Sequence, residues 1–113
     1  MPKDDLVYVG HMLDTTGQAL RKVQGKTREQ FDADEDLRIV AAHLIQTIGE
    51  AARRDSARLR ADHPEIPWDQ IVGIRHRIVH DYMDLDEDVI WEVLVGDLPR
   101  LHDALARIVP PEP

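Results

Sequence analysis

A regular apolar stripe between Asp34 and Leu59 constrains the fold of this chain more than any other feature of the sequence. Apolar side chains recur there every three or four residues, at Leu37, Val40, Ala41, Leu44, Ile45, Ile48, Ala51 and Ala52. The opposite face carries polar side chains, namely Arg38, Gln46, Glu50, Arg53 and Arg54. Because an α-helix turns by about 100° per residue, this pattern predicts a long helix over 34–59 that buries one side against other helices.

The sequence before this stripe predicts a first long helix over 4–23, in which apolar side chains also recur at helical steps. Gly25 is the expected stop, since glycine commonly follows the end of a helix. Thr27, with Gln30 three residues later, resembles a capping box, in which each side chain bonds to the backbone of the other residue. We therefore expect a short turn or helix over 27–31.

The sequence after the stripe predicts two more helices. The prolines of HPEIPW interrupt the helical pattern, and a third helix is expected over about 68–79. A fourth helix should begin near Asp86, whose carboxylate can cap it. Its apolar stripe is Ile90, Leu94, Leu98, Leu101, Leu105 and Ile108. Pro99 lies inside this stripe, so we expect a kink there or a new helix start capped by Asp97.

These segments predict an all-α fold, an up-and-down bundle of four to five helices in a single domain over 1–113. A length of 113 residues is close to the commonest domain size and leaves no room for a second domain. Because so short a chain buries a small share of its surface, we also expect a homodimer in which the copies cover part of each other.

The composition narrows the possible chemistry. The absence of cysteine excludes disulfides, thiolate zinc sites and thiol nucleophiles. No leader is recognisable, and no apolar stretch approaches the roughly 18 residues that a membrane span needs, so we expect a soluble cytoplasmic protein without a membrane partner. The net charge of −8 disfavours a broad nucleic-acid surface, and any contact with RNA must therefore be local.

The segment RHRIVHDY, from Arg75 to Tyr82, concentrates side chains suited to acid–base chemistry on phosphate. Cleavage of RNA without a metal needs a base for the 2′-hydroxyl proton, an acid for the leaving oxygen and a cation for the phosphate. An imidazole exchanges protons at cellular pH, and a guanidinium offers a planar fork to phosphate oxygens. His80 and Arg75 are therefore the expected catalytic pair.

Helical geometry does not by itself bring this pair together. On a continuous helix Arg75 and His80 would lie roughly 140° apart. Either the helix ends near His80 and lets its side chain turn toward Arg75, or residues of two protomers combine across a dimer axis. In the first case Tyr82 would sit beside the pair at the rim of a cleft.

Two other interpretations of the segment stay open at this point. His76 and His80 are four residues apart, which is the spacing of a two-histidine metal site, and Asp81 and Asp84 could complete the ligand set. No second ligand cluster accompanies them, and we expect no metal and no cofactor. The segment could also be an ordinary polar helix end, with its arginines paired to nearby acids.

The chain resembles the HepT-like members of the HEPN superfamily, which are toxins of bacterial toxin–antitoxin pairs. Their signature is an Arg, four residues, a His, one residue and a Tyr, and Arg75, His80 and Tyr82 match it in full. The resemblance also takes in FDADEDLRIVAAHLIQTIGEAA, IPWDQIVGIRHRIVHDY and DEDVIWEVLVGDLPRL, so it covers most of the chain. One departure is His76, where relatives often carry a small polar residue such as Asn, and His76 is therefore a secondary catalytic candidate.

The resemblance implies a homodimeric bundle in which the two signature segments face each other in a cleft at the interface. It implies a metal-independent endoribonuclease that acts through Arg75 and His80, with RNA and not DNA as its substrate. It also implies the toxin role in a type VII-like toxin–antitoxin system. The partner would be a minimal nucleotidyltransferase antitoxin that uses ATP to adenylylate Tyr82 and so switches the toxin off.

Further basic residues are candidates for contact with RNA, namely Arg77, Arg53 and Arg54. Glu50 fits an ion pair with Arg53 or Arg54 better than a direct catalytic role. Pairing of the arginines with Asp55 at a solvated surface is an equally open interpretation. A function of another class is a catalytically inactive helical module that docks a nucleotidyltransferase or a nucleotide.

Overall fold

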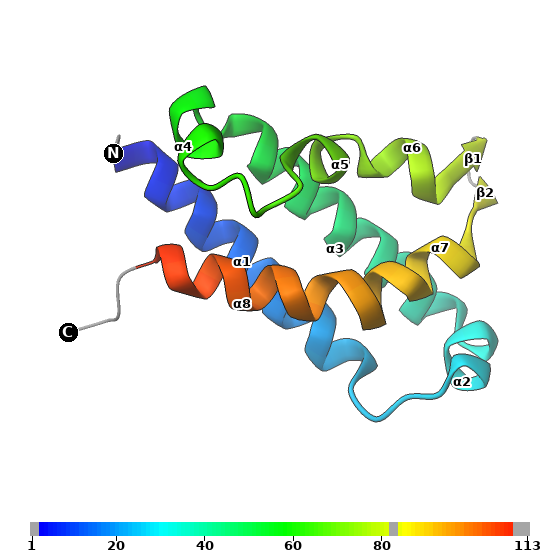
Figure 1. Ribbon diagram of the computed structural model, residues 1–113. Coiled ribbons are helices and arrows are strands. Elements are labelled where there is room, and N and C mark those ends of the chain that lie inside the picture. Colours follow the sequence, from blue (N-terminus) through cyan, green and yellow to red (C-terminus); the bar gives the residue numbers. More distant parts are fainter. Residues whose placement is uncertain (1–2, 82–83, 110–113) are drawn as a thin grey trace.

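The computed structural model describes residues 3–81 and 84–109. Its helices are α1 (Lys3–Val23), α2 (Arg28–Ala33), α3 (Glu35–Arg54), α4 (Ala57–Asp62), α5 (Trp68–Val72), α6 (Ile74–Ile78), α7 (Glu87–Glu92), the π-helix η1 (Val93–Asp97) and α8 (Leu98–Ile108). Two short strands, β1 (Val79–Asp81) and β2 (Asp84–Leu85), pair between α6 and α7. In Figure 1, α1, α3, the α5–α6 pair and the α7–α8 run alternate in direction, which confirms the predicted all-α up-and-down bundle.

The N-terminal part of the bundle follows its local sequence signals. α1 ends at Val23, and Gly25 adopts a positive φ of 74°, a conformation that costs glycine little. The hydroxyl of Thr27 accepts a hydrogen bond from the Gln30 N–H at 3.1 Å, and the Gln30 side chain accepts one from the Thr27 N–H at 2.9 Å. The first helix and the capping box at the start of α2 are therefore confirmed.

The long stripe helix is shorter than predicted, because α3 ends at Arg54 and not near Leu59. Asp55 is extended, and Ser56 opens α4 by accepting the Leu59 N–H on its hydroxyl. The N–H and the hydroxyl of Ser56 also donate to the Asp5 carboxylate, at 2.8 and 2.6 Å. This contact spans 51 positions, so a local hydrophobic pattern does not contain it.

The C-terminal helical run changes its hydrogen bonding before Pro99. Asp86 caps α7 by accepting the Val89 N–H at 3.1 Å, as predicted. The π-helix η1 follows, and α8 then begins at Leu98 with Pro99 in its first turn, where a missing N–H costs little. The expected irregularity is confirmed, but the expected cap by Asp97 is wrong because its side chain makes no capping hydrogen bond.

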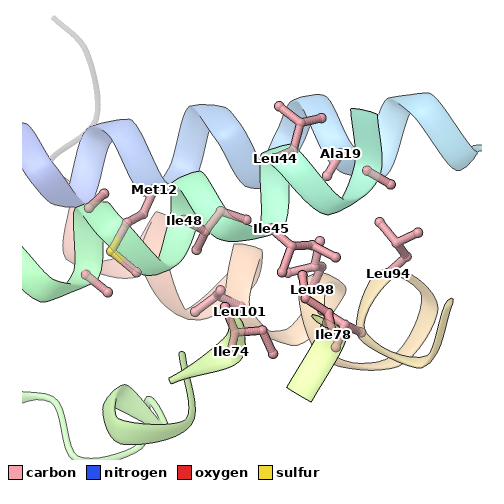
Figure 2. Packing of buried hydrophobic residues seen from close by; sticks show 14 of the residues in the cluster. Met12, Ala19, Leu44, Ile45, Ile48, Ile74, Ile78, Leu94, Leu98 and Leu101 are labelled. Atoms are coloured by element: carbon pink, nitrogen blue, oxygen red, sulfur yellow. The ribbon is translucent and has the colours of Figure 1, made fainter. Parts of the chain in front are cut away.

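The core lies where α1, α3, α6 and the α7–α8 run meet. Figure 2 shows buried side chains from these elements gathered together: Met12, Ala19, Leu44, Ile45, Ile48, Ile74, Ile78, Leu94, Leu98 and Leu101. Each helix buries one face and keeps a polar one. In the part of the chain that the structure describes, none of the helices combines the length and the apolar character needed to cross a membrane.

Candidate functional site

The signature segment changes conformation between Arg75 and His80. α6 ends at Ile78, Val79 is extended with φ −117° and ψ 111°, and the backbone of His80 lies in β1. The separation of about 140° that a continuous helix would impose therefore does not apply. Of the two predicted ways to join Arg75 and His80, a helix that ends before His80 agrees with the backbone.

Backbone hydrogen bonds at the end of α6 include one from the returning chain. The Val79 N–H donates to the Arg75 carbonyl, and the Asp86 N–H donates to the Ile78 carbonyl at 2.7 Å. β1 and β2 run antiparallel with Val79 opposite Leu85, and their register is irregular further along. The sequence did not predict this hairpin, which turns the chain back directly after α6.

Two buried isoleucines determine which face of α6 is free. Ile74 and Ile78, one turn apart, are 7% and 0% exposed, whereas Arg75, His76 and Arg77 are exposed. Within the described residues, these three side chains form no ion pair and no hydrogen bond. The described side chains therefore do not support the alternative in which the arginines of this segment pair with nearby acids.

α3 and α5 approach each other closely just before the signature segment. A Cβ on Gly49 would be 2.8 Å from the carbonyl oxygen of Ile71 and 3.2 Å from Cγ2 of Ile74, so only glycine fits without a shift. The single helix predicted over 68–79 is in fact interrupted at Gly73, which separates α5 from α6. α6 is thus a short helix held against α3 at its beginning.

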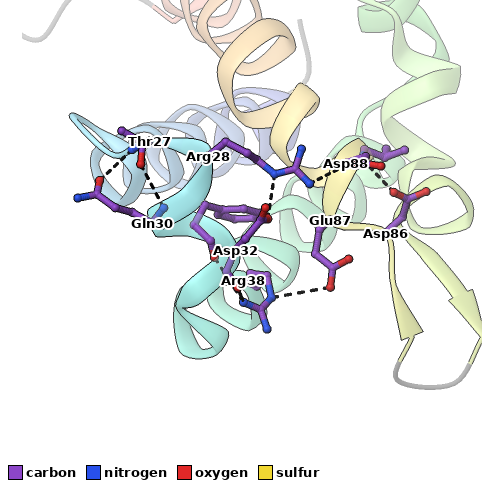
Figure 3. Close-up of polar contacts among 10 residues, drawn as sticks. Thr27, Arg28, Gln30, Asp32, Arg38, Asp86, Glu87 and Asp88 are labelled. Atoms are coloured by element: carbon purple, nitrogen blue, oxygen red, sulfur yellow. Dashed lines mark hydrogen bonds and ion pairs between the residues drawn. The ribbon is translucent and has the colours of Figure 1, made fainter.

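Two arginines tie the start of α7 to the α2–α3 corner, as Figure 3 shows. Arg28 bridges Asp32 at 2.8 Å and Asp88 at 2.6 Å. Arg38 lies 3.8 Å from Glu87 and also donates to the carbonyl of Asp32. The two acids in these contacts, Glu87 and Asp88, belong to the first turn of α7, one residue after β2. These contacts connect the start of α7 to the α2–α3 corner at a partly exposed surface, where each of them is weak.

The arginines at the end of α3 lie apart from the signature segment. Arg53 pairs with Glu50 at 3.6 Å, as predicted, and the Arg54 guanidinium lies 5.8 Å from the ring centre of Tyr8. Figure 1 places the end of α3 near α4, at the opposite end of the bundle from β1 and β2. Within one copy, the structure therefore does not bring Arg53 and Arg54 to Arg75.

Asp55 differs from its predicted role as a solvated partner of arginine. It is 3% exposed, and neither carboxylate oxygen has a hydrogen-bond partner within the described residues. Burial first, and then the charge of Asp5, raises the pKa of Asp55 to about 7, while Arg60 opposes the shift. The Arg60 guanidinium donates to the backbone carbonyl of Asp55 and not to its carboxylate.

Sequence reasoning also missed a groove beside α6. It encloses about 290 Å³ between the α5–α6 pair and the η1–α8 run, with α3 beneath. Arg77 borders it from the same short helix that carries Arg75. Because its lining residues come from segments far apart in the sequence, no local motif marks it.

Two points of the sequence analysis remain, namely the alternative metal interpretation of His76 and His80 and the predicted modification of Tyr82. Since α6 stops at Ile78, His80 does not lie one helical turn after His76, so the backbone lacks the helical two-histidine geometry that the metal alternative requires. Among the described side chains, no three His, Asp or Glu residues cluster so that they could hold an ion. Tyr82, the predicted site of adenylylation, lies outside the described residues.

Comparison with known proteins adds a family match to this geometry. The profile of a family described as Ribonuclease HepT-like matches residues 12–108. A protein of Caldanaerobacter subterraneus subsp. tengcongensis named "Putative RNase" is 28% identical over 105 residues, which cover 93% of this chain and 94% of that protein. A "Probable ribonuclease HepT" of Thermococcus cleftensis is 28% identical over 85% of this chain and 91% of its own length. A "Putative RNase" of Methanocaldococcus jannaschii is 22% identical over 96% of this chain and 91% of its own length. No solved structure matches the chain significantly.

Proposed function

Because the chain belongs to the HepT-like ribonuclease family, we propose that it is a metal-independent endoribonuclease and the toxin of a bacterial toxin–antitoxin pair. The relatives named as ribonucleases support this class of reaction. One observation supports the choice of site above all: α6 ends at Ile78, between Arg75 and His80. The break removes the helical constraint on His80, while Arg75 stays exposed for an anionic substrate.

In the proposed reaction, His80 removes the proton from a ribose 2′-hydroxyl. The 2′-oxygen attacks the adjacent phosphorus, the bond from phosphorus to the 5′-oxygen breaks, and the 5′-oxygen takes a proton from a general acid. The products are a 2′,3′-cyclic phosphate and a 5′-hydroxyl end, so DNA, which lacks the nucleophile, is not a substrate. Arg75 would stabilise the charge on the phosphate oxygens, and His76 is the candidate acid.

We further propose that the active form is a homodimer with both signature segments in one cleft. A single copy presents Arg75 and His76 on an open face of α6, so it would contact a substrate from one side. A second copy would supply the facing wall and a second set of cations. Such a local concentration of positive charge would offset the net charge of −8 on each chain.

The catalytic assignment is tested by cleavage of total RNA in the presence of a chelator. Arg75→Ala and His80→Ala should each lower the cleavage rate by about 100-fold or more, since each removes a charge or proton-transfer role. Arg107→Ala, which removes an exposed arginine in the last turn of α8, is the matched control and should cleave normally. Cleavage that stops in chelator would overturn metal independence, and a wild type that cleaves no RNA would favour the inactive docking module.

Regulation by a cognate minimal nucleotidyltransferase antitoxin completes the proposal, with the bacterial cytoplasm as its setting. Adenylylation of Tyr82, two positions after His80, would place a phosphate and a base where RNA must bind. Incubation with the antitoxin and ATP should add the mass of one AMP to the wild type and not to Tyr82→Phe. Equal labelling of both proteins would place the modification elsewhere.

A further inference from the structure

The groove between the α5–α6 pair and the η1–α8 run has an apolar interior. Its walls include Ile45, Ile48, Ile71, Ile74, Leu98 and Leu101. All of these except Ile71, which is half-buried, are at most 8% exposed. The volume of about 290 Å³ is close to the lower end of the range for small-molecule pockets, about 300 Å³.

The small volume and the apolar lining of the groove favour one kind of occupant. A stable interface with another protein needs about 800 Å² from each partner, and a groove of about 290 Å³ offers far less than this area. A small group with apolar faces and a polar edge fits this volume and would meet the aliphatic side chains that line it. Nucleobases are such groups, since they are flat, apolar on their faces and polar along their edges.

Two cations at the mouth of the groove match the phosphate of a nucleotide. Arg77 comes from α6 and Arg100 from α8, and both are exposed. Neither forms an ion pair with any residue that the structure describes. Arg100 donates through Nε to the Gly96 carbonyl at 3.3 Å, which leaves its terminal NH2 groups free to bind an anion.

The other polar groups on the rim suit the edge of a base better than a bare anion. Gln70 offers an amide that donates and accepts, and Asp97 offers a carboxylate that accepts from the amino groups of bases. Glu65 also lines the groove and lies 3.5 Å from His63. Negative charge on the rim disfavours free phosphate, whereas a nucleotide brings N–H donors to it.

We propose that this groove binds an unpaired base of the RNA substrate, next to the phosphate that is cut. The inference rests on the ribonuclease function proposed above and adds a base-binding subsite to it. Ile74 and Ile78 face the core, so Arg75 and Arg77 project from opposite flanks of α6. A single strand that crosses α6 brings one phosphate to Arg75 and places the base of a neighbouring nucleotide in the groove.

Binding is measured first, without any cleavage step. The full chain with labelled isoleucine and leucine methyl groups is titrated with the four nucleoside 5′-monophosphates, and saturable NMR shifts are expected at Ile71, Ile74 and Leu101. Ribose 5-phosphate, which lacks a base, should leave these signals in place. Signals that move with protein concentration and not with nucleotide would mean that a second copy fills the groove, which would overturn the proposal.

A pair of substitutions on α8 then tests the link to catalysis. Ala104 is half-buried and lines the groove, whereas Ala106 on the same helix is exposed. Ala104→Leu should raise KM for a short RNA by roughly tenfold with kcat retained, because leucine occupies the space of the base. With an RNA that is abasic beside the cut, wild type and Ala104→Leu should have the same KM. Ala106→Leu should match the wild type on both substrates.

The outcomes separate this proposal from the ribonuclease function itself. If the wild type cleaves RNA but Ala104→Leu keeps the same KM on both substrates, the groove holds no base and the ribonuclease function stands. If nucleotides shift the groove signals of a protein that cleaves no RNA, the groove binds a base and the ribonuclease function fails. Should Ala104→Leu unfold, Arg77→Gln combined with Arg100→Gln must weaken nucleotide binding by about tenfold, and unchanged binding would overturn the proposal.

Discussion

Asp55 is a carboxylate that the fold places where its negative charge is costly. It is 3% exposed and has no hydrogen-bond donor within the described residues, and Asp5 beside it is equally buried. Ser56 donates its N–H and its hydroxyl to Asp5, so the available donors serve that carboxylate. Desolvation, increased by the charge of Asp5 and reduced by Arg60, raises the pKa of Asp55 to about 7.

This shift makes the stability of the fold depend on pH. Asp55 ionises near 3.8 when unfolded and near 7 when folded, so its contribution is complete below about pH 4, declines as the pH rises and levels off above about pH 7. Asp55→Asn keeps the shape and removes the charge. We expect it to raise the free energy of unfolding by about 1–3 kcal/mol at pH 8 and to change it little at pH 4.

Urea unfolding at these two pH values measures the difference. Asp62→Asn removes an exposed carboxylate at the end of α4 and is the matched control, for which no comparable gain is expected. A gain at pH 8 that is the same for both variants would contradict the assignment to Asp55, since a general effect of net charge would then explain it.

Single residues were predictable where their role depends on close sequence neighbours. Thr27 with Gln30 and Asp86 with Val89 act within three positions, and both caps formed as predicted. The burial of Asp55 depends on its surroundings in space, including Asp5, and its predicted ion pair was accordingly wrong. The sequence left open whether Arg75 pairs with a nearby acid, and it forms no ion pair within the described residues.

At the scale of elements, the strong apolar stripes predicted the long helices. Most of the places where these helices are interrupted have only weak local signals and were not predicted. The helix predicted from the apolar stripe is correct up to Arg54. Ser56, which donates to Asp5, then begins a new helix. The β1–β2 hairpin has strands of three and two residues, too short to produce a hydrophobic alternation. Yet this hairpin carries His80, so an element that the proposed catalytic site depends on was not predicted.

The contact between α3 and α5 gives an element-scale prediction. Gly49→Ala should lower the free energy of unfolding by about 1–3 kcal/mol, because its Cβ would lie 2.8 Å from a backbone oxygen of Ile71, and backbone yields less readily than a side chain. The displaced α5–α6 pair carries Arg75, so RNA cleavage should fall as well. Thermal unfolding and the cleavage assay measure the two effects.

The matched control for this substitution is Gly10→Ala in α1. An added Cβ at Gly10 meets no atom within 4 Å, so we expect no loss and a gain of about 0.5–1 kcal/mol from helix propensity. If Gly49→Ala unfolds at the same temperature as Gly10→Ala, the close approach does not fix the position of α5.

At the scale of the whole molecule, charge limits how RNA can approach. The chain carries a net charge of −8, and the arginines of α6 and those at the end of α3 lie at opposite ends of the bundle in Figure 1. Within one copy, the described arginines of these two groups therefore do not merge into one basic surface. Productive binding must rely on local contacts, and a second copy that faces the first across α6 would double them.

Mixed dimers test whether the two signature segments share one cleft. Arg75→Ala and His80→Ala are each unfolded, combined in equal amounts and refolded, so that about half of the dimers contain one copy of each. In a shared cleft, such a mixed dimer still holds one intact Arg75 and one intact His80, contributed by different copies. We expect the mixture to recover on the order of a quarter of the wild-type cleavage rate, since each mixed dimer keeps at most one of two complete pairs.

Each variant refolded alone is the control and should stay inactive. If the mixture is as inactive as the single variants while size measurements show dimers, Arg75 and His80 act within one copy, and the end of α6 at Ile78 is then sufficient to bring them together.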